Sequence, residues 1–225
     1  MKRPLNLAAR TVAGLAFGVV LATSMASTAS AALLYEQAPV LDNAFPSSGD
    51  PASDALAYGN GQLADNFSLA GAALLEKVTW WGVYFDPMNP DDFRLRLYTD
   101  VSGSGNVLEQ VDAGAVKRTA TGTTLGGSDV YRYELNLPTA INLGAARPYY
   151  LFVENHGGPD WYWLTGDAGD SEFMGRFADS DHWQNSLTFF DPGVAADLAF
   201  RLDGAGRQSH TDAGQPGELE KIASR

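Results

Sequence analysis

The sequence predicts an all-β protein, a β-sandwich of the jelly-roll kind. Short runs of β-branched and aromatic residues recur along the chain, most clearly at 78–85 and 93–98. In the second run, Phe93, Leu95 and Leu97 alternate with polar residues, which is the period of a strand with one buried face. Turns rich in Gly, Pro, Asn and Asp separate roughly eight to ten such runs, and no amphipathic helix interrupts them.

The first residues, 1–31, have the features of a secretory signal peptide. Three basic residues precede a short apolar run at 12–21, and Ala29-Ser30-Ala31 supplies the small residues of a cleavage site. The apolar run is shorter than the roughly 20 residues that span a bilayer. We therefore expect cleavage after Ala31, no membrane span in the mature chain, and a secreted or cell-surface location.

Charge and cysteine content restrict the partners and the means of stabilisation. The formal charge is −12, and removing the three basic residues of 1–31 gives −12 − 3 = −15 for the mature chain. Such an acidic chain is a poor partner for nucleic acid or anionic lipid, which are bound through clusters of Lys and Arg. The chain has no cysteine, so an exported domain must rely on its core, or on its core with a metal.

One domain is expected at 32–203, followed by a disordered tail at 204–225 that is polar and has no period. Residues 39–61 and 138–147 are expected to be connections, because they are rich in residues that break strands. The expected strands are 33–35, 62–69, 74–85, 93–98, 107–111, 115–121, 130–135, 149–154, 161–164 and 197–202. The strands 74–85 and 93–98 are expected to pair as a hairpin, and 149–154 and 161–164 as another.

Several of these runs resemble one known group of proteins. The runs are Ala64-Asp65-Asn66-Phe67-Ser68-Leu69, Val78-Thr79-Trp80-Trp81-Gly82-Val83-Tyr84-Phe85, Phe93-Arg94-Leu95-Arg96-Leu97-Tyr98, Asp160-Trp161-Tyr162-Trp163 and Asp197-Leu198-Ala199-Phe200-Arg201-Leu202. Together they resemble a family of exported bacterial β-sandwich proteins, many of which carry a C-terminal PEP-CTERM sorting signal. The resemblance implies association with the cell surface or the extracellular matrix. Only Gln215-Pro216-Gly217-Glu218 echoes the sorting signal, so a freely secreted form is expected.

Acidic loops suggest a structural calcium ion, because calcium takes several carboxylate and carbonyl oxygens in irregular loops. The first candidate site consists of Asp86, Asn89, Asp91 and Asp92. The other acidic loops contain Asp167, Asp170 and Glu172, and Asp179 and Asp181, with Asp65 and Asp197 near strand ends as further possible ligands. The alternative is that these residues only form turns and keep the chain soluble.

The aromatic residues suggest a surface that binds carbohydrate. The candidate ligand-binding residues are the five tryptophans, Trp80, Trp81, Trp161, Trp163 and Trp183. Neighbours in a strand face opposite ways, so Trp80 and Trp81 cannot share one sheet face, and one of them either points outward or is covered by a loop. The alternative is that the indoles fill the core and its covering loops.

Catalysis has weaker support. Thiol chemistry is excluded by the absence of cysteine, and the serines do not lie in a nucleophile elbow. Glu134 and Glu154 lie in expected strands and could face a groove, as a glycosidase would need, but no paired-carboxylate motif is present. We expect a secreted, non-catalytic binding module for extracellular polysaccharide with a structural calcium. The alternatives are a purely structural surface or matrix protein, and a hydrolase with an acidic site.

Overall fold

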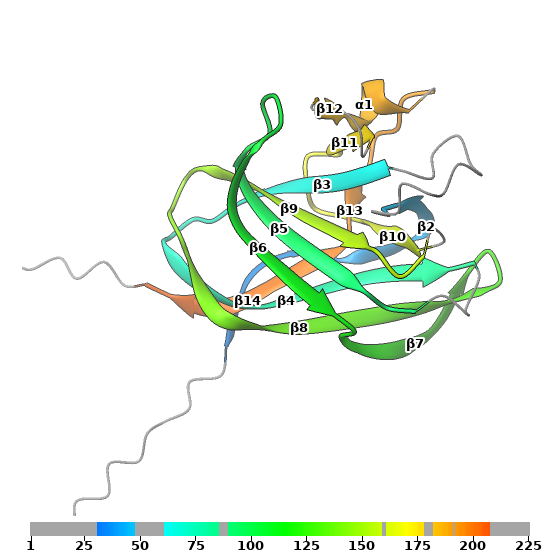
Figure 1. Ribbon diagram of the computed structural model, residues 1–225, viewed down its shortest axis with the longest axis horizontal. Helices are drawn as coiled ribbons and strands as arrows, with labels where there is room; N and C mark the ends of the chain where they lie inside the picture. The colour runs from blue at the N-terminus through cyan, green and yellow to red at the C-terminus, as the bar shows by residue number, and fades with distance from the viewer. Residues whose placement is uncertain are drawn as a thin grey trace, which may run out of the picture.

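Two antiparallel sheets pack face to face in the computed structural model, which describes residues 31–47, 61–85, 90–158, 161–177, 182–190 and 192–207 (Figure 1). The eight-stranded sheet contains β1 (Ala32–Gln37), β2 (Pro39–Pro46), β4 (Ala73–Tyr84), β7 (Lys117–Leu125), β8 (Ser128–Leu143), β10 (Trp161–Gly166), β13 (Asp197–Leu198) and β14 (Phe200–Gly206). The six-stranded sheet contains β3 (Gly61–Ser68), β5 (Phe93–Asp100), β6 (Asn106–Gly114), β9 (Pro148–Asn155), β11 (Phe173–Phe177) and β12 (Gln184–Asn185). One short helix, α1 (Ser186–Phe189), follows β12. The predicted all-β sandwich is confirmed, whereas the jelly-roll order of strands stays a prediction.

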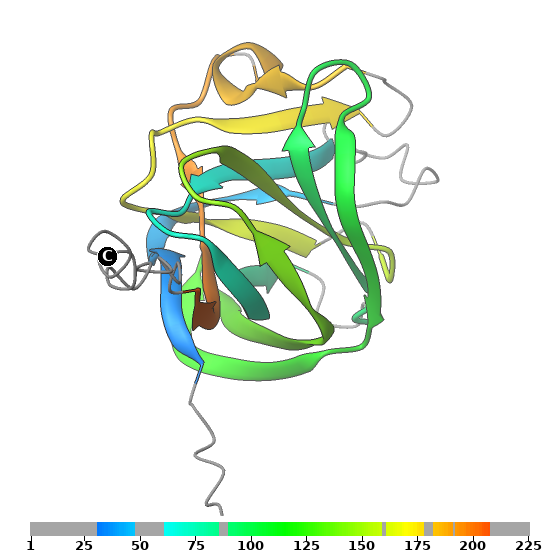
Figure 2. The same ribbon diagram turned by 90° about the vertical axis from the view of Figure 1, so that its left-hand side faces the viewer.

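Strand β4 organises the eight-stranded sheet, because β8 and β14 pair along it and β10 pairs with its end. In the other sheet the order is β12-β11-β3-β9-β5-β6. Strand β1 pairs with β14, so the described chain begins and ends side by side. Figure 2 views the sandwich from one end, with β8 along the bottom and β11 near the top. Among the described residues, no helix is long and apolar enough to cross a membrane.

The core between the sheets is built from aromatic rings that meet edge to face. Phe93 of one sheet lies 5.2 Å from Trp80 and 5.1 Å from Trp161 of the other, measured between ring centroids. Leu198, Phe200 and Leu202 are fully buried, as their alternation predicted. Each such side chain stabilises the folded state by about 1.5–3 kcal/mol through burial.

Both predicted hairpins are wrong. Strands β4 and β5 lie in different sheets, and so do β9 and β10, so each connection crosses from one sheet to the other. The physical reason is that every one of these strands has an apolar face to bury. Crossing the sandwich places Trp80 against Phe93 within the core, whereas a hairpin would place the two strands in one sheet.

Three expected boundaries also change. Pro39–Pro46 forms β2, which pairs Phe45 with Trp163, although a surface connection was expected there. Strand β8 continues to Leu143 past Pro138, because an irregularity in its pairing with β4 lies at that point. Strand β14 continues to Gly206, beyond the expected domain end at 203. Residues 208–225 of the expected tail, and residues 1–30 of the expected signal peptide, lie outside the described residues.

Candidate functional site

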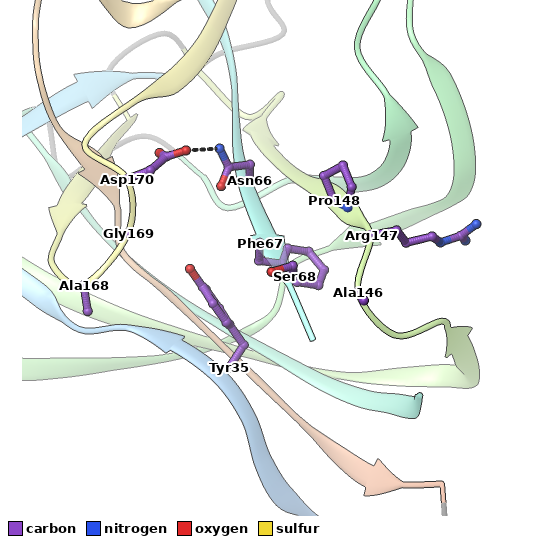
Figure 3. A pocket seen from close by; sticks show the side chains of 10 residues that line it. All are labelled: Tyr35, Asn66, Phe67, Ser68, Ala146, Arg147, Pro148, Ala168, Gly169 and Asp170. Carbon is purple, nitrogen blue, oxygen red and sulfur yellow. Dashed lines mark hydrogen bonds between the residues drawn. The ribbon is translucent and has the colours of Figure 1, made fainter. Parts of the chain in front are cut away.

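A pocket of about 550 Å³ opens at one end of the sandwich (Figure 3). Its walls come from β1, the end of β3, the connection from β8 to β9, and the connection from β10 to β11. Its volume lies within the range of about 300–1,000 Å³ that is usual for small-molecule sites. The pocket therefore joins four segments that are far apart in the sequence.

The floor of the pocket is the aromatic end of the core. The half-buried ring of Tyr35 stacks on Phe200 at 5.6 Å and lies tilted against Phe67 at 5.7 Å. Phe67 is itself stacked on Tyr149 at 5.5 Å. Packing against these two rings fixes the position of Tyr35, so its hydroxyl is held in a defined place at the pocket.

Polar groups form one wall. The amide of Asn66 donates a hydrogen bond from Nδ2 to Oδ2 of Asp170 at 2.7 Å, as Figure 3 shows. The other carboxylate oxygen of Asp170 accepts from the backbone N–H of Glu172 at 3.2 Å. Ser68 lies two residues further along β3 than Asn66, so it is on the same face of the strand, and it is exposed. A carboxylate, an amide and a hydroxyl are thus presented together to any molecule in the pocket.

The backbone around the pocket is strained. Among the described residues, positive φ angles outside glycine occur only at Ala146 (52°), Ala168 (69°) and Ser171 (64°). The first two line the pocket, and the third follows Asp170. Such conformations cost about 1–3 kcal/mol each and gather at functional sites, where the surroundings hold them in place.

Asp197 holds this strained loop. Its Oδ1 accepts a hydrogen bond from the N–H of Ser171 at 2.9 Å, and the carboxylate is only 4% exposed. The loop lies so close that a Cβ on Gly169 would be 2.3 Å from Cγ of Asp197. The glycine is therefore required by close approach, and the loop and carboxylate fit as one unit.

A second buried carboxylate, Asp65, lies behind the pocket floor. Its two oxygens accept backbone N–H groups of Asn66 and Leu198. In the amide orientation that satisfies its neighbours, Gln37 donates to Asp65 at 3.0 Å and accepts from the hydroxyl of Tyr35 at 3.2 Å. A chain of hydrogen bonds thus runs from the pocket to this carboxylate.

The electrostatics of this end are negative. Burial raises the pKa of Asp65 well above its ordinary value, and the carboxylates of Asp197 and Asp170 raise it further. Burial also raises the pKa of Asp197 and, with the nearby Asp65, that of Tyr35. These shifts mean that the site resists additional negative charge.

Arg147 is the cationic residue of the pocket rim, but its side chain extends away from Tyr35 and Asp170 (Figure 3). Its guanidinium lies 4.6 Å from the ring centroid of Tyr149, and Nε donates to the hydroxyl of that tyrosine at 2.6 Å. The charge of Arg147 is therefore directed out of the pocket.

The structure places the five tryptophans predicted to bind ligand in buried positions. Trp80, Trp161 and Trp163 are 0% exposed in the core between the sheets. Trp81, on the opposite face of β4, and Trp183, on the outer face of the six-stranded sheet, are 9% and 8% exposed. Trp81 and Trp183 thus keep the larger exposed fractions of the five, but both pack against other apolar side chains. A buried indole face cannot stack on a sugar.

Of the four residues predicted to bind calcium, the structure describes two, Asp91 and Asp92. Asp86 and Asn89 lie outside the described residues. Asp91 accepts from the hydroxyl of Tyr84 at 2.8 Å and forms an ion pair with Arg118 at 3.2 Å, and Asp92 is exposed. Within the described ranges, no three carboxylate or histidine side chains form a group that could hold a metal. Calcium binding stays a prediction for the loop.

Glu134 and Glu154 lie on different sheets and do not form a pair. Glu134 lies among Lys77, Lys117 and Arg132, while Glu154 is fully buried and accepts from Gln62 at 2.9 Å. The arrangement of two facing carboxylates that suggested a glycosidase is absent for these two residues.

Sequence reasoning grouped Asp170 with other acidic residues but missed Tyr35, Asn66 and Ser68. No motif marks these three, since they become neighbours of Asp170 only when the sandwich closes. Comparison of the chain with models of known protein families finds no match, and comparison with curated proteins finds none.

Proposed function

We propose that this protein is a non-catalytic binding module for extracellular glycans, and that the pocket beside Tyr35 holds one sugar unit of the ligand. The observation that carries the proposal is the composition of the pocket wall. Tyr35 offers part of an aromatic ring, and Asn66, Ser68 and Asp170 offer hydrogen-bonding groups next to it. A sugar presents the same combination, with an apolar face of C–H groups and a rim of hydroxyls.

The fixed geometry of the wall favours binding. Asn66 and Asp170 are joined by a hydrogen bond, and Tyr35 is packed on Phe200 and Phe67. Side chains that are already ordered lose little conformational freedom when a ligand arrives, so more of the contact energy remains as affinity. The strained backbone at Ala168 is consistent with a wall whose shape is maintained for a ligand.

The buried carboxylates support a structural role over a catalytic one. Asp65 uses both oxygens for backbone N–H groups, and Asp197 holds the loop at Ser171. A general acid must reach the substrate directly or through one water, and Asp65 is fully buried. These residues therefore support the pocket wall in the proposal, and the ligand leaves unchanged.

A glycan array probed with the full-length chain tests the proposal. Ser68→Trp places an indole in the pocket from an exposed position, and we expect it to abolish retention of every glycan that the wild type binds. Thr123→Trp on β7, exposed at the opposite end of the sandwich, is the matched control and should bind as the wild type does. Equal retention of a glycan by wild type and Ser68→Trp would show that the glycan does not bind in this pocket. No retention of any glycan would favour the purely structural role. Release of free sugar would favour the hydrolase.

A further inference from the structure

We infer that the pocket selects a glycan unit that carries a protonated amine, that is, a de-N-acetylated amino sugar. The inference rests on the proposed function and names the class of ligand for the same site. The first step is the charge inside the pocket. Asp170 is exposed and lines the wall, whereas the guanidinium of Arg147 is directed outward onto Tyr149. Among the described residues that line the pocket, a ligand therefore meets a carboxylate without a facing cation.

The second step is the number of hydrogen-bond acceptors. A carboxylate has about four acceptor positions, and the structure assigns Asp170 one bond from Asn66 and one from Glu172. The side-chain amide oxygen of Asn66 and the hydroxyls of Tyr35 and Ser68 are further acceptors in the same wall. An ammonium group has three donors and no acceptor, so it matches this set.

The third step is the electrostatic field of the carboxylates that lie behind the pocket wall. The carboxylate of Asp170 lies close enough to Asp65, Asp197 and Tyr35 for its charge to disfavour ionisation of these three groups. A cation in the pocket would relieve this repulsion, whereas a carboxylate on the ligand, as in a uronic acid, would add to it. A neutral N-acetylated sugar would gain nothing from this field.

An ammonium group fits the geometry better than a metal ion does. Calcium requires six to eight oxygen ligands converging at about 2.3–2.6 Å. In the part of the chain that the structure describes, no group of three acidic or histidine side chains converges in this way. An ammonium needs only one carboxylate and neighbouring acceptors at hydrogen-bond distance, as Asp170, Asn66 and Tyr35 provide.

The test is calorimetric titration of the full-length chain at about pH 6, where a primary amine is protonated. The probes are the trimer of glucosamine, the trimer of N-acetylglucosamine, and the diamine cadaverine, which carries the charge without the sugar ring. We expect the glucosamine trimer to bind at least roughly tenfold more tightly than the other two, and high salt to reduce the difference.

Two variants test whether the carboxylate of Asp170 is the charge that attracts the ammonium group of the ligand. Asp170→Asn keeps the shape of the side chain and should weaken binding of the glucosamine trimer roughly fivefold to tenfold while leaving the N-acetylated trimer unaffected. Asp129→Asn makes the same charge change at an exposed position near the turn between β7 and β8, at the opposite end of the sandwich, and should change nothing (Figure 1).

The outcomes separate this inference from the proposed function. If both trimers bind equally and Asp170→Asn has no effect, the inference is wrong and the glycan-binding function stands. If cadaverine binds as tightly as the glucosamine trimer, the site recognises an amine alone, which overturns the amino-sugar assignment. If neither trimer binds and the glycan array shows no retention, the proposed function itself is wrong.

Discussion

Asn66 and Asp170 are 104 positions apart in the sequence and are joined by a hydrogen bond of 2.7 Å from Nδ2 to Oδ2. The bond connects the end of β3 in the six-stranded sheet to the loop that follows β10 in the other sheet. It therefore closes the pocket wall across the edge of the sandwich. The first prediction follows from this contact.

Asn66→Ala should loosen the loop without unfolding the protein. The loss of one exposed hydrogen bond costs about 0.5–1.5 kcal/mol, and the backbone at Ala168 and Ser171 is strained, so local opening becomes easier. Hydrogen exchange of the amides at 168–171 should speed up while exchange in β4 stays unchanged. Asn136→Ala, at an exposed position of β8, is the control. Unchanged exchange at 168–171 would show that Asn66 does not hold the loop.

Gly169→Ala should be destabilising. The added Cβ would lie 2.3 Å from Cγ of Asp197 and 2.4 Å from the side-chain amide of Gln37, so the loop or the buried carboxylate has to move. Overpacking of this kind costs about 1–3 kcal/mol, which a urea melt resolves. Gly71→Ala has open space around its Cβ and should melt as the wild type does. A melt of Gly169→Ala that matches the wild type would mean that the loop does not approach Asp197 as described.

Asp91→Asn should destabilise the fold whether or not calcium is present. The carboxylate pairs with Arg118 at 3.2 Å and accepts from Tyr84 at 2.8 Å, and its side chain is only 11% exposed. Removing the charge leaves Arg118 without its partner, at a cost of about 1–3 kcal/mol. Urea melts with excess chelator and with excess calcium should show the same loss, and Asp92→Asn should show little. A loss that occurs only with calcium would support the calcium site in the loop instead.

Glu134 should contribute to acid sensitivity. Hydrogen bonds from Lys117 and then Lys77, with the charge of Arg132, lower its pKa from 4.5 to about 2. Because the folded-state pKa lies below the unfolded one, the stabilisation is complete above about pH 4.5 and is lost as the pH falls through about 2. Lys117 is largely exposed, so we expect only about 1 kcal/mol. Glu134→Gln should flatten the fall in stability over this pH window. The exposed control Glu109→Gln should not, and equal slopes for the two would refute the assignment.

The local pattern predicted which residues are buried better than it predicted which strands pair. Alternation identified the buried face of β5 and of β14 correctly, because the period of a strand is a local property. Pairing depends on which apolar faces meet. The sequences between β4 and β5 and between β9 and β10 therefore predict hairpin turns. In the structure, the strands on either side of each connection belong to different sheets.

The tryptophans show the same limit of prediction from local sequence. Composition marked them as abundant, but whether an indole is core or surface depends on what the rest of the chain places above it. Trp81 faces outward from β4, and Trp183 lies over the outer face of the six-stranded sheet, yet both are packed against other residues. The pocket was not predictable, because its residues have no common motif and meet only through long-range contacts.

The most direct test of the central claim is chemical-shift mapping of the isotope-labelled full-length chain during titration with the glucosamine trimer. The account predicts shifts concentrated at Tyr35, residues 66–68 and residues 168–170, with the indole signals of the five tryptophans unchanged. Saturable shifts at the tryptophans or on the outer face of the six-stranded sheet, with none at the pocket, would contradict it.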